Sequence, residues 1–183
     1  MELRLTIPKQ KLDDLFPDRQ TIAQAAGEAV ADLVKRHFEE RNGSRTHADG
    51  MPKSNYWDEA RQATRIEMKG DTAVITVDKE GAALHYYGGT VRPGPGKKAL
   101  AIPKHPAVAG MRAREYSGEM FVVWKRGESS GMLVSSEPET AGELMYLLIP
   151  KATLAPDPSV LPTESEMIGE AVKEIEFQRS IWS

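Results

Sequence analysis

The chain has 183 residues, a formal net charge of −3 and no cysteine. Without cysteine, the sequence excludes disulfides, thiolate nucleophiles and thiolate metal sites, and it has no run of about 18 apolar residues that could span a bilayer. The opening residues, MELRLTIPKQ, lack the basic and apolar regions of a secretory signal. We therefore expect a soluble protein that is not exported by this route, and nothing opposes a cytoplasmic location.

Charge is unevenly distributed along the chain. Residues 82–126 contain eight Lys/Arg and two Glu, a net charge of +6, whereas residues 127–183 contain three Lys/Arg and ten acids, a net charge of −7. Segments of opposite charge can neutralise each other within one molecule or between neighbouring molecules of an assembly. The sequence leaves both readings open.

The N-terminal part of the chain predicts a strand followed by a long helix. In the strand, the apolar residues Leu3, Leu5 and Ile7 alternate with polar residues, and the strand ends at Pro8. The helix begins after Asp18, its expected N-cap, and runs to about Arg41. Its apolar residues follow helical spacing and form one core-facing stripe: Ile22, Ala26, Ala29, Val30, Leu33, Val34 and Phe38. His37 lies beside this stripe without a second metal-type residue one turn away, so we expect a structural role for it.

The next segment predicts a loop, a short helix and a hairpin. Residues 44–54 are polar, contain Gly and Pro, and show no periodicity, which indicates a loop. Asn55 is the expected cap of a helix over residues 56–63. Two strands, residues 64–68 and 72–77, are joined by the turn Lys69-Gly70-Asp71.

The stretch from Ala82 to Pro106, AALHYYGGTVRPGPGKKALAIPKHP, is the most distinctive part of the sequence. Residues 83–87 predict a strand that stops at Gly88-Gly89. Residues 88–98 then form an arm rich in Pro and Gly, which cannot be an interior helix or a central strand and so must project or lie against something. Residues 99–102 predict the next strand, and residues 106–114 are ambiguous between a loop and a helical turn.

The C-terminal half predicts three more strands and a final helix. Residues 119–126, EMFVVWKR, form a strong strand with Phe121, Val123 and also Trp124 directed to the core, and residues 132–135 and 144–149 supply the others. Pro150 to Pro162 is an extended Pro-rich connector. Thr163 and Glu166 form a capping box for a helix to about Arg179.

Short turns rather than helical crossovers join the strands, so the sheet is expected to be mostly antiparallel. The predicted fold class is α+β, with the long N-terminal helix packed on the sheet, the Gly/Pro loop projecting and the final helix carried on the connector. The expected division is a core domain over residues 1–150, a connector over 151–162, and a C-terminal helix and tail over 163–183.

A search for chemistry is mostly negative. Gly94-Pro95-Gly96-Lys97-Lys98 lacks the earlier glycine, the Ser/Thr and the following helix of a phosphate-binding loop. His85 and His105 bracket the arm without a recognised nucleophile motif. A small hydrolase or nuclease using these two histidines is the enzymatic alternative, and a small monomeric binding module is another. Neither a cofactor nor a metal ion is implied by the sequence. Contact of the basic residues Arg92, Lys97, Lys98 and Lys104 with the phosphates of a nucleic acid is a further alternative.

Two blocks of the sequence resemble a known family. The succession LHYYGGTVRPGPGKKALAIPKHPAVAGMRAREY is similar to the central block of the virion-morphogenesis proteins of Mu-like phages and prophages, a group of tail-completion or minor tail proteins. In the proteins of this family, a "GGTI-P" motif is followed by a "KxLAIP" strand. The stretch DPSVLPTESEMIGEAVKEI, residues 157–175, resembles the usual ending of the family.

This resemblance implies a non-enzymatic structural protein of the phage tail or neck, active in tail completion or head–tail joining. Its expected partners are copies of itself in a ring, with a hexamer as one option, and other tail or head–tail connector proteins. Its expected location is the virion, after assembly in the cytoplasm of the bacterial host. The residues expected to form assembly contacts lie on the arm, just after the strand that follows it, and on the C-terminal helix: Arg92, Pro93, Lys97 and Lys98, then Lys104, and then Ile168, Val172 and Ile175.

Overall fold

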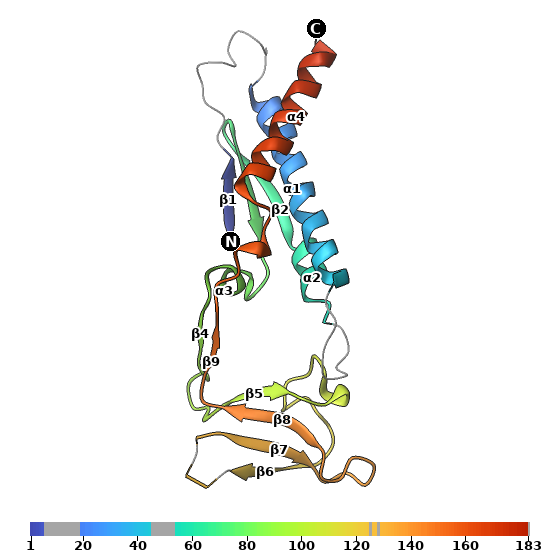
Figure 1. Ribbon diagram of the computed structural model, residues 1–183, viewed down its shortest axis with the longest axis vertical. Helices are drawn as coiled ribbons and strands as arrows, with labels where there is room; N and C mark the ends of the chain where they lie inside the picture. The colour runs from blue at the N-terminus through green and yellow to red at the C-terminus, as the bar shows by residue number, and fades with distance from the viewer. Residues whose placement is uncertain (6–18, 45–53, 125, 128, 183) are drawn as a thin grey trace. The chain divides into compact units, whose positions relative to one another are not determined.

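The computed structural model confirms an α+β protein that is 40% helical and 26% strand, with antiparallel sheets (Figure 1). It describes all residues except 6–18, 45–53, 125, 128 and 183. Contacts divide the chain into two compact units. Unit 1 contains the described residues of Met1–Ser44, Asn55–Tyr87 and Pro156–Ser183, and unit 2 contains Ser54 and the described residues of Gly88–Ala155. The expected core over residues 1–150 thus contributes to both units. None of the helices in the described residues is long and apolar enough to cross a membrane.

Unit 1 contains a three-stranded antiparallel sheet with the order β1-β3-β2. β2 (Thr64–Lys69) and β3 (Thr72–Val77) form the predicted hairpin, and β1 (Glu2–Leu5) pairs with the other edge of β3. The predicted remainder of the first strand, Ile7 and Pro8, lies outside the described residues.

The long helix α1 (Arg19–Ser44) packs along this sheet through its apolar stripe. Its expected N-cap, Asp18, lies outside the described residues. Two members of the predicted stripe, Ala29 and Leu33, are half-buried. The other five are at most 4% exposed: Ile22, Ala26, Val30, Val34 and Phe38. Near one end of α1, the Trp57 ring of α2 (Tyr56–Gln62) stacks on Phe38 at 5.6 Å between centroids. Asn55 precedes α2 but makes no side-chain capping bond.

The strand predicted over residues 83–87 is wrong, because these residues form the short helix α3 (Ala82–Tyr87). Two tyrosines favour a strand locally, but Gly81, at φ +86°, turns the chain into the helix and Gly88, at φ +70°, ends it in the left-handed conformation. The helix is held by tertiary contacts. Ala82 is fully buried, and the His85 ring lies 5.3 Å from that of Trp57.

The C-terminal helix α4 (Glu164–Trp182) packs on α1 of the same chain (Figure 1). The predicted capping box is present, since the Thr163 backbone N–H donates to the Glu166 carboxylate at 2.8 Å and the Glu166 N–H donates to Thr163 Oγ1 at 3.3 Å. Ala171 is buried against Ala26 and Val30. Before α4, a 3-10 turn η3 (Pro158–Val160) leads into the buried Leu161. The end of the predicted connector is therefore part of the core of unit 1.

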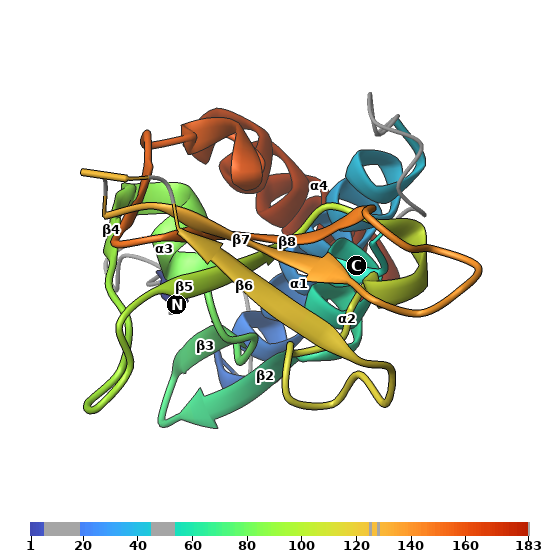
Figure 2. The ribbon, with the colours of Figure 1, turned by 90° about the horizontal axis from the view of Figure 1, so that it is seen from below.

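Unit 2 contains a two-stranded ribbon and a four-stranded sheet. In the ribbon, β4 (Gly89–Val91) pairs with β9 (Ala152–Leu154), so this part of the connector is a strand. We call the four-stranded sheet sheet C; its order is β5-β8-β7-β6 and all its pairs are antiparallel (Figure 2). Its strands are β5 (Leu100–Pro103), β6 (Met120–Trp124), β7 (Gly131–Ser135) and β8 (Leu144–Ile149).

The core of unit 2 lies on one face of sheet C, under the segment that contains the 3-10 turn η2 (Pro106–Val108). Val108, Met145 and Tyr146 are fully buried there. The prediction that Phe121, Val123 and Trp124 enter the core is wrong, because they are 49%, 36% and 46% exposed. β6 is an edge strand, and the covering segment packs only as far as Met120 and Leu133.

Candidate assembly surfaces

One face of sheet C is apolar and uncovered by the described residues. Cross-strand partners point to the same face of a sheet, and the register joins Phe121 to Val134, Val123 to Met132, and Met132 to Leu147. None of the residues on this face is buried. We call it the open face: Leu100, Ile102, Phe121, Val123, Met132, Val134, Leu147 and Ile149.

Sequence reasoning did not identify the open face, although a signal was present. β8 reads LMYLLI without polar alternation, a pattern typical of strands with apolar residues on both faces. Alternate residues of β8 belong to different environments: Tyr146 and Leu148 point to the core, while Leu147 and Ile149 belong to the open face. A strand that is apolar on both sides needs a second covering layer, and the described part of unit 2 supplies only one.

The arm is an exposed turn between β4 and β5. The Lys97 N–H donates to the Gly94 carbonyl at 3.0 Å, and Gly96 has φ +75°. Of the arm residues expected to form contacts, Arg92, Lys97 and Lys98 are exposed and Pro93 is half-buried. Lys104 is exposed beyond the end of β5, and its N–H donates to the Met145 carbonyl at 2.8 Å.

A basic hollow lies beside the arm within unit 2. It has a volume of about 380 Å³, and its lining includes Pro93, Lys97, Arg112 and Arg114. Arg112 also lies 3.9 Å from the carboxylate of Glu115. Three cationic side chains around one hollow favour an anionic partner such as a carboxylate.

The three expected contact residues of α4 have different environments. Ile168 and Val172 are 49% and 45% exposed, whereas Ile175 is half-buried and packs with the core cluster of Val30 and Ile75. Ile168 lines an apolar pocket of about 530 Å³ that also includes Ile75, Tyr86 and Met167. Phe177 and Ile181, at 58% and 60%, are further exposed apolar residues of this helix. Ile168 and Val172 are thus available for a partner.

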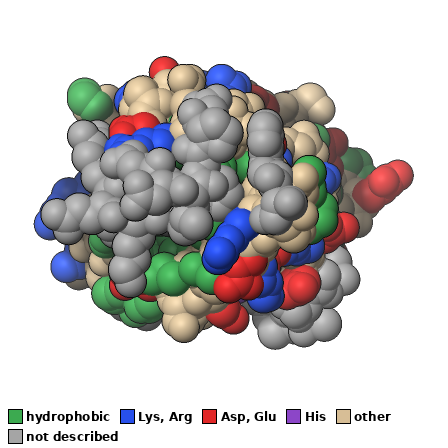
Figure 3. All heavy atoms as spheres, turned by 90° about the horizontal axis from the view of Figure 1, so that it is seen from above, with side chains coloured by type: hydrophobic (Ala, Val, Ile, Leu, Met, Phe, Trp, Pro, Cys, Tyr) green, Lys and Arg blue, Asp and Glu red, His purple; other side chains and the backbone are tan. Residues whose placement is uncertain are grey.

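Two acids of the C-terminal segment pair with bases of α1. Arg36 binds Glu170 at 2.8 Å, and Arg41 forms an ion pair with Asp157. Within the described residues, Arg92, Lys97 and Lys98 have no ion-pair partner. On the face drawn in Figure 3, basic and acidic side chains lie interspersed. The intramolecular neutralisation that the sequence allowed therefore leaves the charges of the arm available.

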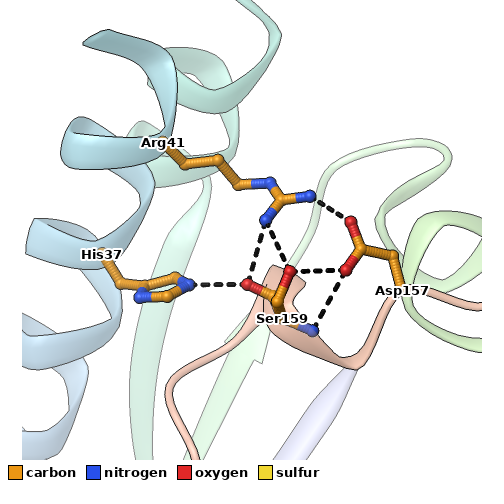
Figure 4. Close-up of polar contacts among 4 residues, drawn as sticks. All are labelled: His37, Arg41, Asp157 and Ser159. Carbon is orange, nitrogen blue, oxygen red and sulfur yellow. Dashed lines mark hydrogen bonds and ion pairs between the residues drawn. The ribbon is translucent and has the colours of Figure 1, made fainter. Parts of the chain in front are cut away.

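A polar network fastens η3 to α1 (Figure 4). His37 Nε2 lies 2.8 Å from the Ser159 carbonyl oxygen, and Arg41 donates to that oxygen and to Ser159 Oγ, each at 3.0 Å. Ser159 Oγ in turn donates to Asp157 Oδ1 at 2.5 Å. His37 therefore has a structural contact, as the sequence suggested. Its partners could not be predicted because they lie more than one hundred residues away along the chain.

This network makes the stability of unit 1 dependent on pH in acid. The hydrogen bond from Ser159, and then the Arg41 guanidinium, hold the pKa of Asp157 below its ordinary value of 3.8. Because the folded-state pKa is depressed, the stabilisation is present above pH 3.8 and is lost as the pH falls through the lower folded value. We expect Asp157→Asn to lower the thermal midpoint at pH 7 and to weaken its fall below pH 3.8.

Thermal melts from pH 7 down to acid, followed by circular dichroism, measure this effect. Asp71→Asn, in the exposed turn of the β2–β3 hairpin, is the matched control and should melt like the original protein. An Asp157→Asn profile that coincides with that of the original protein throughout would contradict a stabilising role for this carboxylate.

His85 and His105, the two histidines of the enzymatic alternative, lie in different units, and each contacts residues of its own unit. In unit 1, the His85 ring packs against Tyr56 and Trp57. In unit 2, His105 Nδ1 accepts the Ala107 N–H at 3.2 Å, and its Nε2 lies 2.7 Å from the Glu143 carboxylate. Among the described residues, no three side chains of the types that bind metals gather to hold an ion.

Comparisons with models of protein families, with curated proteins and with solved structures found no match.

Proposed function

We propose that this chain is a structural protein of a phage tail or neck, which acts in tail completion or head–tail joining as a homo-oligomeric ring. The family proposal rests on the sequence blocks described above, at residues 84–116 and 157–175. The first block runs from α3 through the arm and β5 to η2 and the residues after it, and the second runs from η3 into α4.

The open face of sheet C is the observation that carries a role in assembly. Monomeric soluble proteins rarely expose contiguous apolar patches larger than a few hundred Å². Met132, at the middle of this face, is 36% exposed, and Phe121 beside it is 49% exposed. Covering such side chains removes apolar area from water and so favours association. The proposed occupant is the next copy of the chain in the ring.

The arm supplies the charged part of the same proposal. In a closed ring, one patch of a subunit meets a different patch of the next, so opposite charges on separate segments suit the contact. Lys97 and Lys98, both exposed on the arm, provide the positive charge of this contact. On α4, Glu164 and Glu176 are exposed acids without an ion pair among the described residues. The same surfaces account for contacts with other tail or connector proteins at the ends of the ring.

Mass measurement on the native protein tests the proposal. We expect a closed oligomer much heavier than the 20.2 kDa chain by analytical ultracentrifugation, and rings by negative-stain microscopy. Met132→Lys would place a charge in the open face and should dissociate the ring. Tyr87→Lys, at an aromatic residue of α3 in unit 1 that is 66% exposed, is the control. A native mass of 20.2 kDa would instead favour a monomeric binding module.

The arm gives a second prediction, on salt dependence. Replacing Arg92, Lys97 and Lys98 together by Ala should leave the fold intact, because exposed charges contribute about 0–1 kcal/mol to stability. It should weaken assembly at low salt and remove the dependence of assembly on salt, since screening acts on these charges. Sedimentation at several salt concentrations measures both effects.

The control for the arm is Arg65→Ala with Lys69→Ala, two exposed bases on β2 of unit 1. This pair should keep both the oligomer and its response to salt. If the arm variant assembles like the original protein at every salt concentration, the arm is not an assembly contact.

A further inference from the structure

The outer edge of β6 is an apolar strand edge without a partner in the described part of the chain. β6 pairs with β7 alone among the described strands, and it is the outermost strand of sheet C (Figure 1). Its residues Phe121, Val122 and Trp124 are 49%, 48% and 46% exposed. Natural proteins usually protect such an edge with charges, proline or a covering segment, because it can pair with another strand.

Hydrogen bonds to β7 show which backbone groups of β6 point outward. The Ser136 N–H donates to the Glu119 carbonyl at 3.0 Å, so this pair is hydrogen-bonded across the ladder. The direction of these bonds alternates along an antiparallel strand. Phe121 and Val123 therefore bond to β7, whereas the N–H and C=O groups of Met120, Val122 and Trp124 point away from the sheet.

The opposite edge of sheet C is protected. On β5, the Lys104 N–H donates to the Met145 carbonyl at 2.8 Å, so by the same alternation Ala101 and Pro103 direct their backbone nitrogens outward. Proline has no N–H to donate and is typical of edges that do not pair. A continuous ladder onto β5 is therefore interrupted at Pro103, and sheet C is open to extension on its β6 side.

We infer that β6 pairs antiparallel with β6 of a second copy, about a twofold axis through Val122. This register pairs all five residues of the strand, with Met120 of one copy opposite Trp124 of the other. It also brings the outward N–H and C=O groups of both strands face to face. The contact is isologous, because each copy contributes the same surface.

Charge and side-chain order support a second copy as the occupant. β6 has the exposed acid Glu119 before it and the exposed base Arg126 after it, so antiparallel pairing brings the acidic end of one strand to the basic end of the other. Trp124 is ordered before association: a Cβ atom at Gly131 would lie 2.7 Å from the Trp124 ring, so the ring rests on this glycine. An ordered aromatic residue loses little side-chain entropy on binding.

This inference rests on the self-association proposed above and adds a contact that a ring does not need. A ring closes through contacts between different patches, whereas the β6 contact joins like patches. Together the two contacts would join rings in pairs.

Val122→Pro tests the contact, because it removes an N–H that points away from β7 and leaves the bonds to β7 in place. The matched control is Val122→Thr, which keeps the N–H and a β-branched side chain. We expect the native mass to fall twofold in Val122→Pro and to be unchanged in Val122→Thr, with circular dichroism showing folded protein in both. A Val122→Pro oligomer of the original mass would overturn the β6 contact and leave the ring proposal standing.

Exchange of the flanking charges is a second test that leaves the backbone unchanged. Glu119→Arg and Arg126→Glu should each weaken the twofold contact at low salt, and the double exchange should restore it. Failure of the double variant to regain the original mass would count against the antiparallel register. An original protein of twice 20.2 kDa that Val122→Pro converts to a monomer would support the β6 contact while contradicting the ring.

Discussion

Removal of residues 163–183 should lower the thermal midpoint of the protein sharply or prevent unit 1 from folding. α4 covers α1 through Ala171, which is 4% exposed, and through the half-buried Met167 and Ile175. Half-burying a Met or Ile side chain contributes about half of the roughly 1.5–3 kcal/mol of full burial, and the Ala171 methyl group adds about 0.8 kcal/mol, so the loss is on the order of 3 kcal/mol. That is a substantial part of the roughly 5–15 kcal/mol by which a typical protein is stable.

The control for this truncation keeps the helix and changes its exposed apolar residues. Phe177→Ser with Ile181→Ser should leave the melting curve nearly unchanged, because these side chains are 58% and 60% exposed. Differential scanning calorimetry compares the three proteins. A truncated protein with the original midpoint would contradict packing of α4 on its own chain, and a folded but monomeric truncation would indicate that the helix docks on a neighbour.

Gly27→Ala should destabilise the protein, although the same change in most helices is stabilising. A Cβ atom at Gly27 would lie 2.4 Å from Ala73 Cβ and 2.8 Å from Ile66 Cδ1, closer than atoms can approach. Replacing Gly by Ala in a helix interior normally gains up to about 1 kcal/mol. Overpacking costs about 1–3 kcal/mol, so the clash between α1 and β3 should decide the sign.

Gly169→Ala in α4 is the matched comparison, since no atom lies within 4 Å of a Cβ built there. It should raise the free energy of unfolding by up to about 1 kcal/mol through helix propensity alone. Urea denaturation of both variants measures the contrast. Stabilisation by Gly27→Ala equal to that by Gly169→Ala would show that α1 and β3 are farther apart than the structure places them.

Elements with strong local signals were predictable from the sequence. The stripe of α1 has helical spacing, the β2–β3 hairpin has a Gly turn, and the capping box of α4 requires only Thr163 and Glu166. In each of these the determining contacts lie within a few residues along the chain. The residues of the arm and α4 proposed as contacts were likewise selected by composition and resemblance, and Arg92, Lys97, Lys98, Ile168 and Val172 are exposed.

Other features depended on which segments meet in the folded chain. α3 has the tyrosines of a strand but is helical because Ala82 and His85 pack against other residues of unit 1, among them Trp57. Phe121 and Val123 alternate as core residues do, yet they lie on the open face because no described segment covers it.

By itself, the sequence determined the α+β class, the antiparallel connections and the two helices, because periodicity, caps and turn residues act locally. Only the tertiary structure decided that Ile175 packs inward while Ile168 faces outward, that Arg41 meets Asp157, and that β6 lies at an open edge. The physical reason is that burial depends on what lies opposite a residue. That partner is supplied by a distant part of the chain or, at the open face and the β6 edge as proposed here, by another copy.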